Sequence, residues 1–192
     1  MCIMEVNEEN FYPVISKWLR SSIGCQYTGE RKILWGRQPD VLGVKFEVRG
    51  RLVALLHLIE VKVIDSLTSA YNLIGEMESR IASFHKENSI FYALYPYLGI
   101  YEAYDAREVR DYAENRRVGL ISLKDDYALS LEKSPTPILS NKTLSIRDLN
   151  EQNWIKDEGE AKIFREAVKT IDWWMWRRII EASNLTHTNR WS

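Results

Sequence analysis

Residues 52–64 are the segment that most constrains how this chain can fold. Nearly all of its side chains are apolar, and in a strand alternate side chains point to opposite faces of the sheet. Both faces of this strand are therefore apolar, which is typical of a strand covered by helices on both sides. Glu60 and Lys62 interrupt one face near its end. A charge in that setting needs an ion pair, a metal ion or an opening to water.

Two interpretations of Glu60 and Lys62 are open on this strand alone. They could form an exposed ion pair where the sheet frays into water, since such pairs are common and weak. They could instead belong to a functional site, in which case other chemically active side chains should converge on them. The strand that precedes them in the chain favours the second interpretation.

Residues 40–48 also have the pattern of a strand, and the turn pair Arg49-Gly50 joins them to the apolar segment. This arrangement predicts a β-hairpin. Asp40 and Glu60 are about equally distant from the turn, so the hairpin would bring their carboxylates together. Two ionised carboxylates about 4 Å apart repel by roughly 4 kcal/mol at an effective dielectric constant near 20, so they need a cation between them. Mg²⁺ or Mn²⁺ suits such oxygen ligands.

The rest of the chain predicts helices and strands in alternation. A first helix has an apolar stripe from Phe11 to Leu19, with Asn10 as N-cap and Gly24 at its end. The later expected elements are a short strand at 33–35, a helix from Ser66 or Thr68 to about Lys86, a strand at 90–95, a helix at 106–116, a strand at 118–123, a turn-rich surface loop at 124–142 and a last helix at 158–182. Strands separated by helices predict a mixed sheet within a three-layer α/β core.

Composition excludes several classes of protein. The 192 residues are enough for one compact domain. Only Cys2 and Cys25 are present, and the three histidines lack the spacing of metal ligands, so a zinc or iron-sulfur site is not expected. The N-terminus lacks the pattern of a secretory signal, and no apolar run is long enough to cross a bilayer. We expect a cytoplasmic protein with no membrane partner.

The dipeptide Pro39-Asp40 and the tripeptide Glu60-Val61-Lys62, placed on one hairpin, resemble the signature of the PD-(D/E)xK nuclease superfamily. A helix before the hairpin and a helix and strand after it match the αβββαβ restriction-endonuclease-like core of that superfamily, over about residues 8–123. The resemblance implies a nuclease-like core at residues 1–124. Residues 125–192 would then form a C-terminal loop and a Trp-rich helical extension packed on the same domain.

The resemblance also implies the chemistry. The chain would be a Mg²⁺-dependent DNA endonuclease, with Mn²⁺ as an alternative, which hydrolyses phosphodiesters with a metal-activated water. The metal ligands would be the Asp40 and Glu60 carboxylates and the Val61 carbonyl. Lys62 would orient the water and offset charge on phosphorus.

A glutamate from the first helix reaches the active site in some members of the superfamily. Glu8 is the preferred candidate here, as a fourth catalytic residue, and Glu9 is the alternative. Either could instead be an acidic residue favoured by the helix dipole. Some members also carry a Gln in the helix after the lysine, and this chain has only Asn72, Glu76 or Glu78 in that region.

Contacts with DNA would need local basic residues, because the net charge of the chain is −1. Basic residues cluster around the hairpin in sequence, and the chosen candidates are Arg31, Lys32, Arg37 and Lys45. Lysine and arginine also protect the edges of sheets, which is an alternative role for them. Trp173 and Trp176 could stack on unpaired bases, although the apolar stripe of their helix also suits core packing or a homodimer.

Two competing readings have different consequences. A nuclease-fold protein without activity could serve as a nucleic-acid-binding or protein-interaction module, because a fold does not determine a function. Such a module would bind DNA without needing metal. Alternatively, the motif is accidental, and Asp40 and Glu60 then do not converge.

Overall fold

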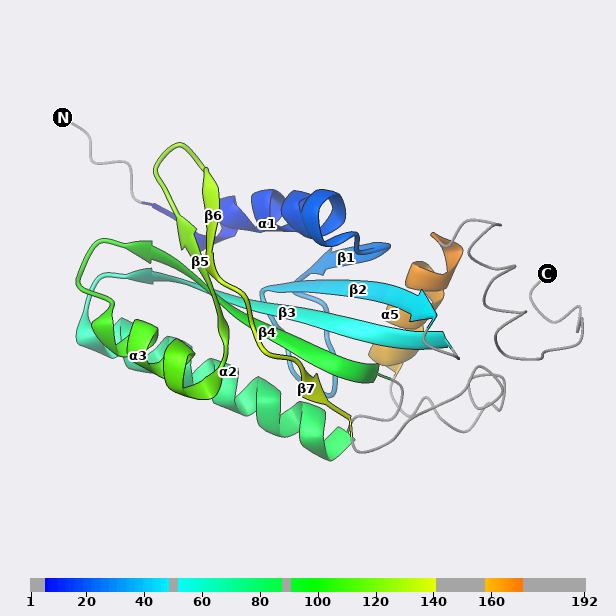
Figure 1. Ribbon diagram of the computed structural model, residues 1–192. Coiled ribbons are helices and arrows are strands. Elements are labelled where there is room, and N and C mark those ends of the chain that lie inside the picture. The colour runs from blue at the N-terminus through cyan, green and yellow to red at the C-terminus, as the bar shows by residue number, and fades with distance from the viewer. Residues whose placement is uncertain (1–5, 49–51, 88–90, 141–157, 171–192) are drawn as a thin grey trace, which may run out of the picture.

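A seven-stranded mixed sheet forms the centre of the computed structural model, which describes residues 6–48, 52–87, 91–140 and 158–170 (Figure 1). The strand order is β1-β2-β3-β4-β5-β6, with β7 paired to β4. The strands are β1 (Tyr27–Glu30), β2 (Val41–Val48), β3 (Leu52–Ile64), β4 (Phe91–Glu102), β5 (Gly119–Leu123), β6 (Leu129–Lys133) and β7 (Ile138–Leu139). β3, β4 and β5 are parallel to one another, and the other pairings are antiparallel. The predicted α/β class with a mixed sheet is confirmed.

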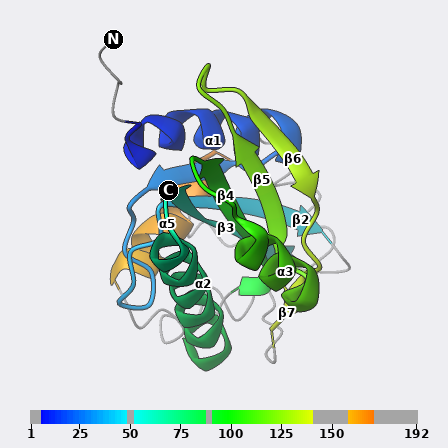
Figure 2. The same ribbon diagram turned by 90° about the vertical axis from the view of Figure 1, so that its left-hand side faces the viewer.

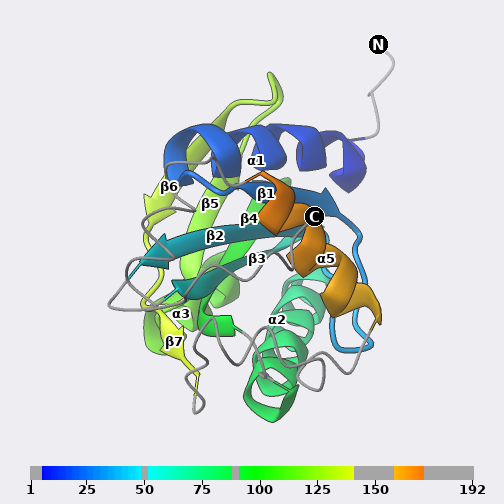
Figure 3. The same cartoon turned by 90° about the vertical axis from the view of Figure 1, so that its right-hand side faces the viewer.

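Helices lie against both faces of this sheet (Figure 2). The described helices are α1 (Tyr12–Trp18), α2 (Leu67–Glu87), α3 (Arg107–Arg116) and α5 (Glu158–Lys169). α1 covers one face, and α2 and α3 cover the other. α5 packs beside β1 and β2 (Figure 3), where its Phe164 ring meets the ring of Phe46 edge-on at 5.6 Å. The described ranges include no helix that is both long enough and apolar enough to span a membrane.

β3 is buried on both faces, as its sequence predicts. Its even-numbered side chains, among them Leu56 and Leu58, join the core under α2, while Ile59 and Val61 join the core under α1. In the hairpin, Val41 pairs with Ile59 and Val48 pairs with Leu52. The predicted antiparallel pairing is therefore confirmed, although the turn at residues 49–51 lies outside the described residues.

The first helix begins differently from the prediction. Asn7, and not Asn10, is the N-cap, because its side chain accepts a hydrogen bond from the backbone N–H of Glu9 at 3.1 Å. A 3₁₀ turn over Glu8–Phe11 then leads into α1. The apolar pattern predicts too late a start for this helix, because a 3₁₀ turn such as Glu8–Phe11 has no apolar periodicity of its own. A π-helical turn over Leu19–Ile23 continues α1 to Gly24, which has φ +82°, a left-handed conformation that glycine adopts without strain, so the predicted end is confirmed.

The strand pairing in the structure differs from the prediction in two segments. The expected strand at 33–35 is only an isolated bridge between Leu34 and Arg37, and β1 precedes it instead. The expected surface loop at 124–142 contains β6, which pairs with β5, and β7, which pairs with the part of β4 that β5 does not reach. These strands are short, and their partners rather than their own patterns make them strands.

The sequence also predicts the start of α2 and the extent of the last helix. Ser66 is the N-cap of α2, because its hydroxyl accepts a hydrogen bond from the backbone N–H of Ser69 at 3.2 Å. The Ser69 hydroxyl accepts in return from the Ser66 N–H at 3.1 Å. The predicted helix at 158–182 is helical over α5, and Trp173 and Trp176 lie outside the described residues.

A buried histidine makes the stability of this core sensitive to acid. His57 on β3 is 4% exposed and stacks on the ring of Tyr95 at 4.7 Å. Its Nε2 atom lacks a hydrogen-bond partner among the described residues. Burial lowers the pKa of His57 from 6.5 to about 4, with a smaller contribution from the nearby Lys45 ammonium. Between about pH 6.5 and 4, the His57 ring therefore stays neutral in the folded protein, whereas the same ring takes up a proton in the unfolded chain.

We expect stability to fall as the pH falls from 6.5 towards 4, and His57 should contribute no further loss below that range. The full loss should be about 3 kcal/mol in the free energy of unfolding. Urea unfolding at several pH values measures it, and a His57→Phe protein, which cannot take up this proton, is the control. Parallel pH profiles for the two proteins would contradict the assignment.

Candidate active site

The site forms beside the first residue of β2, where β3 runs on past the edge of that strand. β2 begins at Val41, opposite Ile59, so the register places Asp40 beside Glu60. Beyond this point β3 pairs with no backbone on the β2 side among the described residues, and carboxylates take its place. Asp40 Oδ2 accepts from the Val61 N–H at 2.7 Å, and Glu8 Oε1 accepts from the Val63 N–H at 3.2 Å. Two acidic side chains thus complete the hydrogen bonding of a strand edge.

Asp40 is held from both sides. Its second oxygen, Oδ1, accepts a hydrogen bond from the Tyr12 hydroxyl of α1 at 2.8 Å. Burial and the adjacent Asp40 charge both raise the pKa of Tyr12, so this phenol remains a donor at any physiological pH. Since Tyr12 is 3% exposed, its ring cannot move far, and Asp40 has a defined orientation.

Glu60 is the most deeply buried carboxylate of the site, with 1% exposure. Arg80 of α2 reaches it, with Nε 2.6 Å from Oε1, and Arg80 Nη2 also donates to the Gln38 carbonyl at 3.1 Å. Burial raises the pKa of Glu60, Arg80 opposes this shift, and the Asp40 charge adds to it. Glu60 is therefore costly to ionise unless a positive charge lies beside it.

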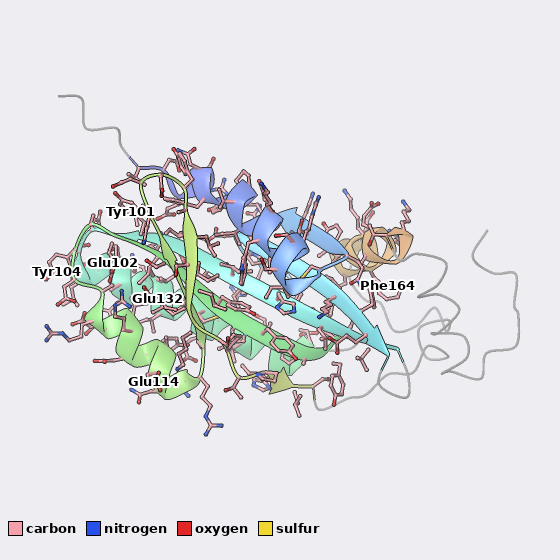
Figure 4. The ribbon with its side chains drawn as sticks, turned by 45° about the horizontal axis from the view of Figure 1, so that its top comes forward. Tyr101, Glu102, Tyr104, Glu114, Glu132 and Phe164 are labelled. Carbon is pink, nitrogen blue, oxygen red and sulfur yellow. The ribbon has the colours of Figure 1, made fainter. Side chains whose placement is uncertain are left out.

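Lys62 and Glu8 lie next to an open groove. Lys62 Nζ is 3.5 Å from Glu8 Oε1. The groove, of about 860 Å³, is lined by residues from the N-terminal segment, β3, α2, the end of β4 and the β5–β6 turn: Val6, Asn7, Glu8, Lys62, Val63, Asp65, Ser69, Tyr101, Ala103 and Asp125. Figure 4 shows Tyr101 at this end of the molecule, opposite Phe164. The groove lies at the carboxyl ends of the parallel strands, where open α/β sheets bind ligands.

Three residues of the site were not chosen from the sequence. No sequence pattern singles out Tyr12 or Arg80, and Glu76 is only one of three residues in the region where some nucleases carry a Gln. Burial raises the pKa of Glu76, and the charges of Asp40 and Glu8 add to the shift while those of Lys62 and Arg80 oppose it. One signal was available, because Glu76 and Arg80 are four residues apart and so share a face of α2.

The structure separates the two candidate glutamates. Glu8 contacts Lys62 and the β3 backbone, as described, whereas Glu9 pairs with Arg31 at 2.7 Å, with about half of each side chain exposed. The arrangement therefore brings Glu8 to the site and leaves Glu9 at its outer rim.

The four basic residues predicted to contact DNA do not lie together. Arg31 lies over the Tyr12 ring at 5.7 Å, close to Asp40, and Lys32 and Arg37 follow in the segment that leads to β2. Lys45 pairs with Glu47 at 3.3 Å and lies opposite Leu55. Five residues separate that position from Glu60, which is roughly 17 Å along a strand. The structure does not bring Lys45 to the site.

The donor atoms present would suit a hard cation. Within the described ranges, no three His, Cys, Asp or Glu side chains are grouped closely enough to hold a metal ion. The predicted set is smaller, with two carboxylates and one backbone carbonyl. The Val61 N–H points to the edge that β2 leaves open, and the N–H and C=O of one strand residue point to the same side. The Val61 carbonyl therefore points to the same open edge, and all three oxygens are of the type that Mg²⁺ and Mn²⁺ prefer.

Neighbouring strands thus hold Asp40 and Glu60, and Lys62 follows on the same strand face. Such an arrangement can bind a cation and place an ammonium group beside it. Comparison with known proteins adds no relative, because no family model, curated protein or solved structure matches this chain.

Proposed function

We propose that this protein is a metal-dependent DNA endonuclease of the PD-(D/E)xK type. The observation that carries the proposal is the meeting of Asp40, Glu60 and Lys62 at the open end of β3, with Asp40 bonded to the Val61 N–H. The element order α1-β1-β2-β3-α2-β4 also agrees with an αβββαβ restriction-endonuclease-like core. Likeness of fold alone would not support an activity, so the proposal depends on the site.

The residues have separate roles in this proposal. Asp40, Glu60 and the Val61 carbonyl would hold Mg²⁺ or Mn²⁺, which when bound polarises the scissile phosphate and lowers the pKa of a water ligand. Tyr12 and the β3 backbone orient Asp40. Lys62 would offset negative charge on the phosphate, and Glu8 keeps its ammonium at the mouth of the groove.

DNA would approach from the side where positive charge is available. Arg31, Lys32 and Arg37 lie on the segment before β2, with Arg31 close to Asp40, and suit phosphate contacts. The groove that Lys62 lines also carries the carboxyl groups of Glu8, Asp65 and Asp125, which repel a phosphate backbone. The cytoplasmic location and the homodimer stay predictions from the sequence.

Removal of the metal tests the function directly. Purified protein should cut labelled DNA in the presence of Mg²⁺ or Mn²⁺, and cutting should stop when a chelator is added and return when metal is restored. Duplex, branched and single-stranded substrates, assayed side by side, would identify the preferred DNA shape. Cutting that is indifferent to chelator would contradict the proposal.

A catalytically inactive binding module is the second candidate, and one observation favours it. Glu60 is already paired at 2.6 Å with an arginine whose side chain is only 14% exposed, and this arginine supplies the positive charge that a metal would otherwise bring. The same assay separates the two candidates. DNA binding that does not change with metal, together with no cutting of any substrate, would favour the inactive module.

A further inference from the structure

The Glu60–Arg80 pair differs from the other described ion pairs in its burial. The two side chains are 2% and 14% exposed, whereas Arg116 and Glu78, which link α3 to the same helix, are 62% and 41% exposed. An arginine fork held between a carboxylate and the Gln38 carbonyl has little freedom to move. Arg80 is thus a fixed positive charge on one of the proposed metal ligands.

Arg80 is surrounded by more negative than positive side chains. Glu60 and Glu76 both interact electrostatically with Arg80, with Asp40 and with each other or with Glu8. Lys62 is a second cation beside Glu76. Breaking a buried ion pair leaves an uncompensated charge, which is strongly unfavourable. Glu60 therefore needs Arg80 as long as no other cation is bound, and a divalent ion could take over the same role.

We propose that Arg80 is an internal counter-ion that competes with the divalent metal for Glu60. This inference rests on the proposed function, because it concerns the same carboxylates. Metal binding then requires the Arg80 guanidinium to release Oε1 of Glu60, and the metal affinity is weaker than the carboxylates alone would provide. Arg80 is a positioning residue in the metal-free protein and a competitor when metal is added.

Calorimetric titration with Mn²⁺ in the absence of DNA tests the competition. The Arg80→Met protein, which has a side chain of similar length without the charge, should bind Mn²⁺ about tenfold more tightly than the wild type. Arg80→Lys retains a cation and should stay close to the wild type. Arg116→Met removes an arginine of α3 that pairs with Glu78 of α2 outside the site, and the Mn²⁺ affinity of this variant should not change. Equal or weaker binding by Arg80→Met would overturn the proposal.

A second measurement needs no substitution. The Nε–H group of Arg80 donates to Glu60, so its proton resonance in an NMR spectrum should move during Mg²⁺ titration, in step with calorimetric saturation. Arg20, in the helical turn that follows α1, is the internal control, since its Nε donates to the Thr28 hydroxyl at 2.6 Å. An Arg80 signal that stays in place at saturating Mg²⁺ would show that the metal does not displace it.

The outcomes separate this inference from the function on which it rests. If wild type and Arg80→Met bind metal equally, with binding lost in Asp40→Asn, the metal site is real and the competition is wrong. If only Arg80→Met binds metal, the competition is correct and is strong enough to keep the wild type metal-free. If neither protein binds metal, the metal site of the proposed function is wrong, and the competition fails with it.

Discussion

Replacement of Asp40 by Asn is expected to reduce metal-dependent cleavage by about 1,000-fold or more, because it removes one of two charged metal ligands. The fold should survive. The Asn carbonyl can still accept from the Val61 N–H, and its amide group can donate to the Tyr12 hydroxyl, so both present partners remain bonded. The free energy of unfolding should change by no more than about 1–2 kcal/mol.

The measurement combines cleavage rates, Mn²⁺ affinity and thermal unfolding. Asp111→Asn is the matched control, since Asp111 is exposed on α3 and the same charge is removed there. Loss of cleavage with loss of Mn²⁺ binding and near-normal stability would support the role of Asp40. An Asp40→Asn protein that cuts DNA as fast as the wild type would be incompatible with the proposed function.

Replacement of Lys62 by Met should lower the cleavage rate by about 100- to 1,000-fold, a loss typical of removing one group that stabilises charge in a transition state. Metal affinity should not weaken, because a positive charge near the carboxylates opposes metal binding. Lys62 is partly exposed. Its ion-pair partner Glu8 would still accept a hydrogen bond from the Val63 N–H after the replacement. The defect should therefore appear in kcat more than in KM.

Lys133→Met is the control for this experiment. Lys133 on β6 has a similar exposure, 28% against 25% for Lys62, and also pairs with a glutamate, Glu114, at 2.7 Å. Figure 4 shows Glu114 on α3. If both lysine variants lose activity equally, the loss reflects altered packing or charge in general, and Lys62 has no special role.

The sequence predicted the centre of the fold because that part depends on local periodicity. β3 is apolar on both faces, and the apolar spacing of α2 from Leu73 to Phe84 matches its buried side. The hairpin register also followed from the sequence, since the turn lies midway between Asp40 and Glu60. Each of these features is encoded within a few consecutive residues or by counting from one turn.

Other features were missed because their cause is distant in the chain. β6 is a strand because the edge of β5 offers it backbone partners, although most of its side chains are exposed. Arg80 is 20 residues from Glu60 in sequence and meets it only because α2 folds back across the sheet. The Tyr12–Asp40 hydrogen bond spans 28 residues in the same way.

The sequence by itself determined that this chain has a buried strand with Glu60 and Lys62 on one face, joined to a partner strand that begins after Asp40. Alternation and turn position are properties of the backbone, so they need no information from the rest of the chain. Only the tertiary structure decided how those charges are balanced. Arg80, Glu76, Tyr12 and Glu8 come from helical segments, and the folded arrangement of layers places them against the open end of β3. Burial there sets the cost of each charge, and burial exists only once the layers have packed.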